Sequence, residues 1–195
     1  MTAAEVYVAE RVAEILEICG VRDENPELDL THTPQRVARM FFRELLTGYN
    51  IVRLSALRKQ FTTFTKRGQH ELVIIRDVPF YSLCAHHMMP FFGTAALGYL
   101  PSDKVIGLSK FPRVLDHFAA RLQTQEQLLS DVADFVMVEA KPEALIVVLR
   151  AQHLCCEARG VRKPGTQMVI AAVRPQPLPD HLRSEFYSLM SLRSQ

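Results

Sequence analysis

The order of its periodic segments constrains this chain more than any other feature of the sequence. Apolar residues recur at helical spacing in four segments, residues 6–19, 33–47, 109–122 and 128–136. Runs rich in β-branched and aromatic residues, typical of strands, lie at 71–83, 93–100, 144–152 and 167–174. A last helix is expected from Asp180. Two pairs of strands with two helices between them predict an α+β domain, with an antiparallel sheet that has helices on one face.

The chain shows no internal repeat and no long linker, so we expect one domain over residues 1–195. Within it, residues 1–50 are expected to form an N-terminal helical region and residues 60–195 the core that contains the sheet. The first helix should end at Gly20 and bury Cys19 on its apolar face. A Pro-rich connector, residues 174–179, should lead into the last helix.

Composition excludes several classes of protein. Apolar residues make up 48% of the chain, yet no stretch has the ~18–20 uncharged residues that a membrane helix needs. Glu5, Glu10 and Arg11 interrupt the apolar pattern of the first residues, unlike the apolar block of a signal peptide. A net charge of +2 does not favour nucleic acid, and four cysteines are too few for a disulfide scaffold. We therefore expect a reduced, cytoplasmic protein.

Cysteine and histidine gather at the ends of two predicted strands. Cys84 and His87 form a C-x-x-H pair, which lets one turn offer two ligands to a zinc ion. A third ligand must come from His153, Cys155 or Cys156. If the second strand continues through residue 155, His153 and Cys155 share a face.

Two kinds of metal site remain open on these residues. Cys84, His87 and Cys155 would leave a fourth position free, as in catalytic zinc sites, whereas His153 or Cys156 as fourth ligand would close a structural site. In the open site, His86 and His153 would be free imidazoles available as general acids or bases. The thiols could also be ordinary core residues.

Cations accumulate at three further places. Arg159 begins an R-G-V-R-K-P-G segment, Lys110 and Arg113 follow Ser109 at a helix start, and Arg36 and Arg39 share one side of a helix. Singly, such residues are usually solvated surface. Together with a metal cluster they indicate a phosphorylated substrate.

Five segments, in order, resemble motifs of the GTP cyclohydrolase I family. FYSLCAHHMMPFFG resembles its zinc motif FYSLCEHHLLPFFG, and AQHLCCEARGVRKPG resembles its H-x-C-x-x-x-RG-V-x-K segment. VIGLSKFPRVLD, RLQTQEQL and THTPQRVARM are similar to its GLSK-x-x-R-x-x-D, RLQ-x-QE-x-L and TP-x-RVA-K/R-M segments. The resemblance implies a tunnelling fold (T-fold), a four-stranded antiparallel sheet backed by helices. It also implies a homodecamer of two stacked pentameric rings with active sites between subunits.

The resemblance further implies conversion of GTP to 7,8-dihydroneopterin triphosphate and formate, a step of pterin and folate biosynthesis. Zn²⁺ would be held by Cys84, His87 and Cys155, while His86 and His153 move protons. The triphosphate would be bound by Arg39, Ser109, Lys110, Arg113 and Arg159. The guanine and ribose would be bound by Gln125 and Glu126.

The chain departs from the family pattern beside the metal motif. Ala85 stands where the family has Glu, Arg39 stands where Lys is usual, and Cys156 adds a spare thiol. The missing carboxylate leaves two alternatives open, because such neighbours often orient metal ligands. One is a diverged paralogue that acts on another purine nucleotide or stops at a ring-opened intermediate. The other is a non-catalytic, zinc-stabilised oligomeric scaffold.

Overall fold

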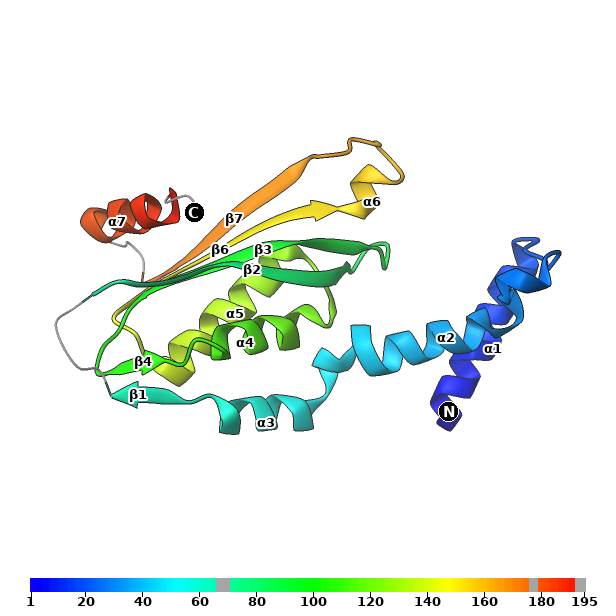
Figure 1. The fold of residues 1–195 in the computed structure, drawn as a ribbon, viewed down its shortest axis with the longest axis horizontal. Helices are drawn as coiled ribbons and strands as arrows, with labels where there is room; N and C mark the ends of the chain where they lie inside the picture. The colour runs from blue at the N-terminus through cyan, green and yellow to red at the C-terminus, as the bar shows by residue number, and fades with distance from the viewer. Residues whose placement is uncertain (66–70, 176–178, 192–195) are drawn as a thin grey trace.

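The computed structural model describes residues 1–65, 71–175 and 179–191, and its body is a mixed sheet covered by helices (Figure 1). The four long strands are β2 (Val73–Cys84), β3 (Pro90–Leu100), β6 (Ala144–His153) and β7 (Gln167–Arg174). They pair antiparallel in the order β2–β3–β6–β7. The predicted α+β class is confirmed. The sheet has five strands rather than four, however, because β5 (Leu122–Gln123) adds parallel to the end of β2.

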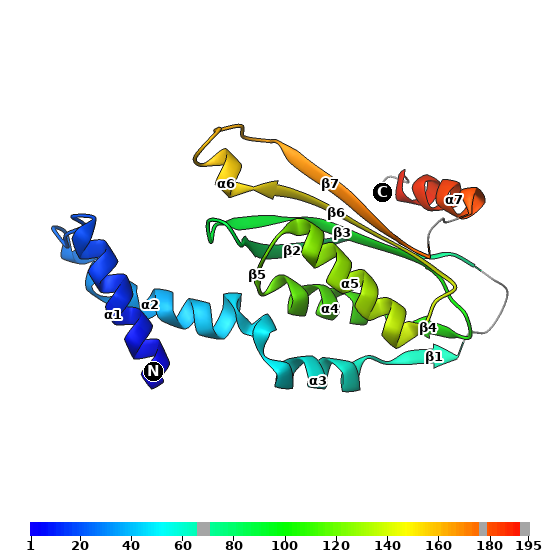
Figure 2. The same ribbon diagram turned by 180° about the vertical axis from the view of Figure 1, so that it is seen from behind.

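Two helices cover one face of this sheet, as Figure 2 shows from behind. They are α4 (Lys110–Ala119) and α5 (Gln125–Ala140). Phe111 and Leu115 of α4 and Leu128 and Val132 of α5 are fully buried against the strands. Burial of each such side chain contributes roughly 1.5–3 kcal/mol, so this layer is the main core of the protein.

The other face of the sheet is covered at one end by α7 (Asp180–Ser191). Leu182 and Phe186 pack there against Ala144 and Ile146 of β6. Leu145, between those two strand residues, belongs to the core on the α4–α5 face instead. This alternation is the period of two expected of a strand that is buried on both faces. The predicted Pro-rich connector to α7 lies partly outside the described residues.

Three elements that precede α4 in the chain were also not predicted from the sequence. They are α3 (Ile51–Gln60), β1 (Thr63–Thr65) and β4 (Lys104–Ile106), the last two pairing antiparallel. The side chain of Asn50 begins α3 by accepting hydrogen bonds from the N–H groups of Val52 and Arg53. The helix buries no residue fully, which explains why its sequence lacks a strong apolar stripe.

The N-terminal region projects from the body as an arm (Figures 1 and 2). It contains α1 (Ala3–Ile18), the short turns Pro26–Leu28 and Leu30–His32, and α2 (Thr33–Met40), continued by helical turns at Phe41–Leu45 and Thr47–Tyr49. A buried carboxylate, Glu5, holds α1 to the helical turn that follows α2 through Arg43 (Nε–Oε1 2.7 Å). The prediction that Cys19 is a core residue is wrong, because α1 packs mainly on α2 and leaves that thiol exposed. None of the described helices is both long and apolar enough to span a membrane.

Candidate metal centre

Two turns at one end of the sheet bring three soft donors together. After β2 ends at Cys84, the chain turns sharply, with the N–H of Met88 donating to Cys84 O (2.9 Å). β6 ends beside this turn, and α6 (Leu154–Glu157) follows at once. The ligand atoms of Cys84, His87 and Cys155 all lie within 4.8 Å of one another. The structure thus brings together the three residues predicted to bind a metal.

The route by which Cys155 reaches this group differs from the prediction. The strand does not continue through residue 155. It ends at His153, and Cys155 lies in the short helix α6. The helical turn leaves Cys155 buried and Cys156 exposed, with their sulfurs 4.0 Å apart. Among the described residues, Cys156 is not part of the group of mutually close donors.

The donor set fits a soft divalent cation. Two thiols and an imidazole are typical zinc ligands, and Cys84 Sγ lies 3.8 Å from His87 Nδ1. Burial, together with the neighbouring Cys84 and Cys156 sulfurs, raises the pKa of Cys155 to about 11. That thiol therefore stays protonated at neutral pH unless a cation favours the thiolate. Three protein donors are also the number found in catalytic rather than structural zinc sites.

Both predicted proton-transfer residues lie beside the group. His86 is exposed, with Nδ1 3.7 Å from Cys84 Sγ. His153 lies flat on Phe91, with ring centroids 4.9 Å apart and planes 5° apart. Burial lowers the pKa of His153, while the nearby carboxylates of Glu126 and Glu157 partly oppose that shift. Phe91 was not identified from the sequence, because the predicted strand began only at residue 93 whereas β3 begins at Pro90.

The predicted substrate residues are divided among three places. Glu126 and Arg159 are exposed near the metal donors, at the start of α5 and just after α6. Ser109, Lys110 and Arg113 lie at the start of α4, about 15 Å of helix from the end that leads to β5. Arg39 lies on α2, in the arm. Of the residues expected to bind the triphosphate, one chain therefore brings only Arg159 close to the metal donors.

Gln125, predicted to contact guanine, is buried instead. Its side chain is 1% exposed, and its amide is hydrogen bonded to the protein at both ends. Glu157 near it has a buried oxygen, Oε1, without a hydrogen-bond partner among the described residues.

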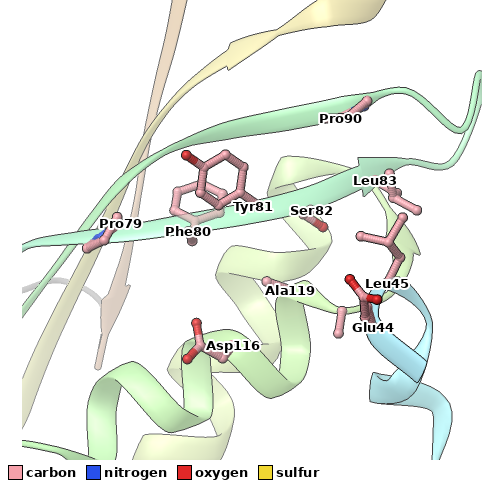
Figure 3. Close-up of a pocket in the computed structure, with 11 residues that line it drawn as sticks. Glu44, Leu45, Pro79, Phe80, Tyr81, Ser82, Leu83, Pro90, Asp116 and Ala119 are labelled. Atoms are coloured by element: carbon pink, nitrogen blue, oxygen red, sulfur yellow. The ribbon is translucent and has the colours of Figure 1, made fainter. Parts of the chain in front are cut away.

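A separate cavity of about 440 Å³ follows β2 on the side of α4. Figure 3 shows its lining, which is formed by residues 79–83 of β2, Asp116 of α4 and the Glu44–Leu45 segment of the arm. Burial raises the pKa of Asp116. None of the predicted site residues lines this cavity, so it is distinct from the metal centre.

Comparison with known proteins identifies the family. A profile of GTP cyclohydrolase I matches residues 8–191. The chain is 43% identical to GTP cyclohydrolase 1 of Clostridioides difficile (strain 630) over 165 residues, which are 84% of this chain and 83% of that one. It is 41% identical over 190 residues to GTP cyclohydrolase 1 of Listeria monocytogenes serotype 4b (strain F2365), with 94% of each chain covered.

Among solved structures, the archaeosine synthase QueF-Like in the apo form matches 54% of this chain and 95% of its own, with a TM-score of 0.44 and 18% identity. The profile match over nearly the whole chain and the two long alignments at above 40% identity agree with the Cys-His-Cys group, and this chain belongs to the GTP cyclohydrolase I family.

Proposed function

We propose that this protein opens the imidazole ring of GTP by hydrolysis, releasing formate and forming 7,8-dihydroneopterin triphosphate. Zn²⁺ is held by Cys84, His87 and Cys155. The observation that carries the proposal is the meeting of these three donors, with His86 and His153 beside them, in a member of this family.

The reaction needs a nucleophile at C8 and a proton for the ring nitrogen that leaves. When bound, zinc acts as a Lewis acid that makes water a competent nucleophile near neutral pH. His153 is suited to exchange the proton, because its lowered pKa keeps the imidazole neutral and able to accept one. His86, exposed on the turn beside Cys84, is the second imidazole, and it exchanges a proton in the later step that releases formate.

The substrate carries about four negative charges on its triphosphate, which calls for several cations and N–H donors. Arg39, Arg113, Arg159, Lys110 and the hydroxyl of Ser109 supply them. The carboxylate of Glu126, exposed near His153, accepts hydrogen bonds from the guanine N–H groups.

The site is completed by a neighbouring copy of the chain in a ring of T-fold subunits. Within the described residues, β7 has a strand partner on one side only, and β2 lacks an outer partner before Leu83. Because the four long strands alternate in direction, joining these edges head to tail keeps every pair antiparallel. We propose that this assembly also brings the start of α4 of one copy to the metal donors of a neighbouring copy. Two such pentameric rings form the decamer.

The function is tested by anaerobic incubation of the zinc-loaded protein with GTP, followed by a formate assay and mass spectrometry of the product. We expect stoichiometric formate and dihydroneopterin triphosphate, both formed at least about 100-fold more slowly in a His153→Ala variant that still binds zinc. Formate or a ring-opened intermediate without a pterin would favour the diverged paralogue suggested by Ala85. Intact GTP with zinc confirmed in place would refute the proposal.

The shared site is tested by mixing two inactive variants. Cys155→Ser lacks a metal donor, and Arg113→Ala lacks a triphosphate contact. If the two residues serve one site from different subunits, co-refolded hybrids contain some sites with neither change. Activity above the sum of the separately refolded parents is therefore expected. Hybrids no more active than that sum would show that each chain forms its own site.

A further inference from the structure

Gln125 opens α5 at a point where the helix, β6 and β7 meet. Its Nε2 atom lies 3.2 Å from the carbonyl oxygen of Leu149 on β6 and 3.1 Å from that of Met168 on β7. Its Oε1 atom lies 2.8 Å from Nε2 of His153. The amide of Gln125 thus forms hydrogen bonds with β6, with β7 and with the imidazole of His153.

These contacts determine which way the amide points. Backbone carbonyl oxygens only accept hydrogen bonds, so the atom that faces Leu149 and Met168 must be the amide nitrogen. Both N–H bonds of Gln125 are then used. The remaining atom, Oε1, can only accept, and His153 must therefore present an N–H at Nε2.

The imidazole is restrained from turning to another arrangement. One face of His153 is stacked on Phe91 in nearly parallel planes. Phe91 is fully buried, and its pairing with His153 across β3 and β6 fixes the backbones of both residues. With Nε2 committed to Gln125, Nδ1 is the ring atom with a lone pair to accept a proton.

We infer that Gln125 is a positioning residue, which holds His153 as the Nε2–H tautomer and leaves Nδ1 to exchange protons with the substrate. The residue therefore acts through His153 and not by contacting guanine. Its kinetic consequences rest on the proposed function, whereas the tautomer itself does not.

The first test separates positioning from substrate binding. Gln125→Met keeps the length of the side chain and removes the amide. Loss of a group that orients a reacting imidazole should lower kcat roughly 10–100-fold and leave the Kd for GTP within about twofold. Gln123→Met is the matched control, since Gln123 is a buried amide bonded to Ser82 and Phe118 and not to His153. A raised Kd with unchanged kcat in Gln125→Met would overturn the inference.

The second test asks whether the effect passes through His153. In a His153→Ala background, Gln125→Met should change the residual rate by less than about twofold, because the group that it positions is gone. A guanine contact predicts the same factor in both backgrounds. Full additivity of the two substitutions would therefore contradict a positioning role.

The third test needs no change at Gln125. Solid-state ¹⁵N NMR of histidine-labelled, zinc-loaded protein at pH 8, with His153→Ala to assign the signals, reports which ring nitrogen carries the proton. We expect protonated Nε2 and unprotonated Nδ1, and the opposite tautomer would overturn the inference. This measurement also decides the question if the wild-type protein releases no formate from GTP, a result that would refute only the proposed function.

Discussion

The two ends of the sheet are built from the same strands but differ in how they use side chains. At the far end, α7 lies over the strands with Phe186 fully buried in a space that Gly98 leaves open. A Cβ on Gly98 would lie 2.3 Å from Phe186 Cδ2, so the fit there is one of shape. At the metal end, His86 and His87 are exposed, and the donors come from the last residue of β2, the turn after it and the short helix α6. Apolar packing at one end stabilises the strands whose other end positions the chemistry.

The metal end also carries the joint to the arm. Gly48 donates its N–H to Ala120 O (2.9 Å), and Arg121 returns a hydrogen bond from Nε to Gly48 O (2.9 Å). The Tyr49 hydroxyl donates a hydrogen bond to Leu122 O (3.1 Å). Leu122 belongs to β5, the strand that pairs with the end of β2 at Cys84. A Cβ at Gly48 would lie 2.3 Å from His117 O, which restricts this position to glycine. The segment from Ala120 to Leu122 thus contacts both the arm and the strand that carries Cys84.

The largest effect is expected from removing a donor at the metal end. Cys155→Ser should lose bound zinc and more than about 100-fold in turnover, because even residues that only orient ligands are worth roughly 10–100-fold. Zinc content by mass spectrometry and formate release measure the two effects. Cys19→Ser, at an exposed thiol of the arm, is the control and should retain both. Equal zinc loss in Cys156→Ser would indicate a closed site with four protein ligands.

The next effect concerns stability at the far end. Phe186→Ala removes a fully buried ring from between α7 and the sheet, which should cost about 3–5 kcal/mol of local stability. Limited proteolysis of α7 should quicken, while kcat per zinc stays within about twofold. A comparable loss of kcat would show that the two ends of the sheet are coupled.

A second substitution tests the shape argument. Gly98→Ala alone should destabilise α7, because the new methyl group collides with Phe186. In the Phe186→Ala background the same change should be nearly neutral, since the ring is absent. Additive losses would indicate that Gly98 is needed for its backbone conformation instead.

A smaller effect is expected at the joint, as a dependence of stability on pH. Burial, and then the charges of Arg121 and Arg53, lowers the pKa of His117. The unfolded chain therefore binds a proton more readily, and stability should fall as pH drops below about 6.5. His117→Gln should reduce the difference in the free energy of unfolding between pH 5.5 and pH 7.5, measured by chemical denaturation at each pH. If the free energy of unfolding of the variant depends on pH as it does in the wild type, His117 is not the group responsible.

The strands and long helices could be predicted because their apolar periods are local. β7 runs over residues 167–174, the predicted range. The predictions failed where a residue or strand depends on a packing partner that lies far away in the sequence. Cys19 continues the apolar period of α1 at the C-cap of the helix, but such a period does not show which part of the protein covers that face. The short strand β5 has two residues, fixed by pairing with β2 and too few to show a pattern.

Two of the three metal donors were predictable for a related reason, whereas the spacing left the third open among His153, Cys155 and Cys156. A C-x-x-H pair on one turn sets its own geometry, so Cys84 and His87 meet whatever the rest of the fold does. The environment of Gln125 was not predictable, because its three partners come from β6 and β7, 24 to 43 residues away. Sequence spacing gives the residue its place at the start of α5 but not the carbonyls that fix its amide.

The smallest effect is expected from restoring the family carboxylate at the metal end. Ala85 is exposed on the turn between Cys84 and His86, and its N–H donates to Gln123 O (3.1 Å), so a longer side chain can extend into solvent without displacing the backbone. Ala85→Glu should therefore change stability by no more than about 0.5 kcal/mol and GTP turnover by no more than about threefold. Ala85→Gln controls for size without charge, with formate release as the measure for both. A gain above tenfold in the Glu variant alone would mean that the turn normally needs this charge, and that the natural alanine marks a changed substrate preference at an otherwise complete metal centre.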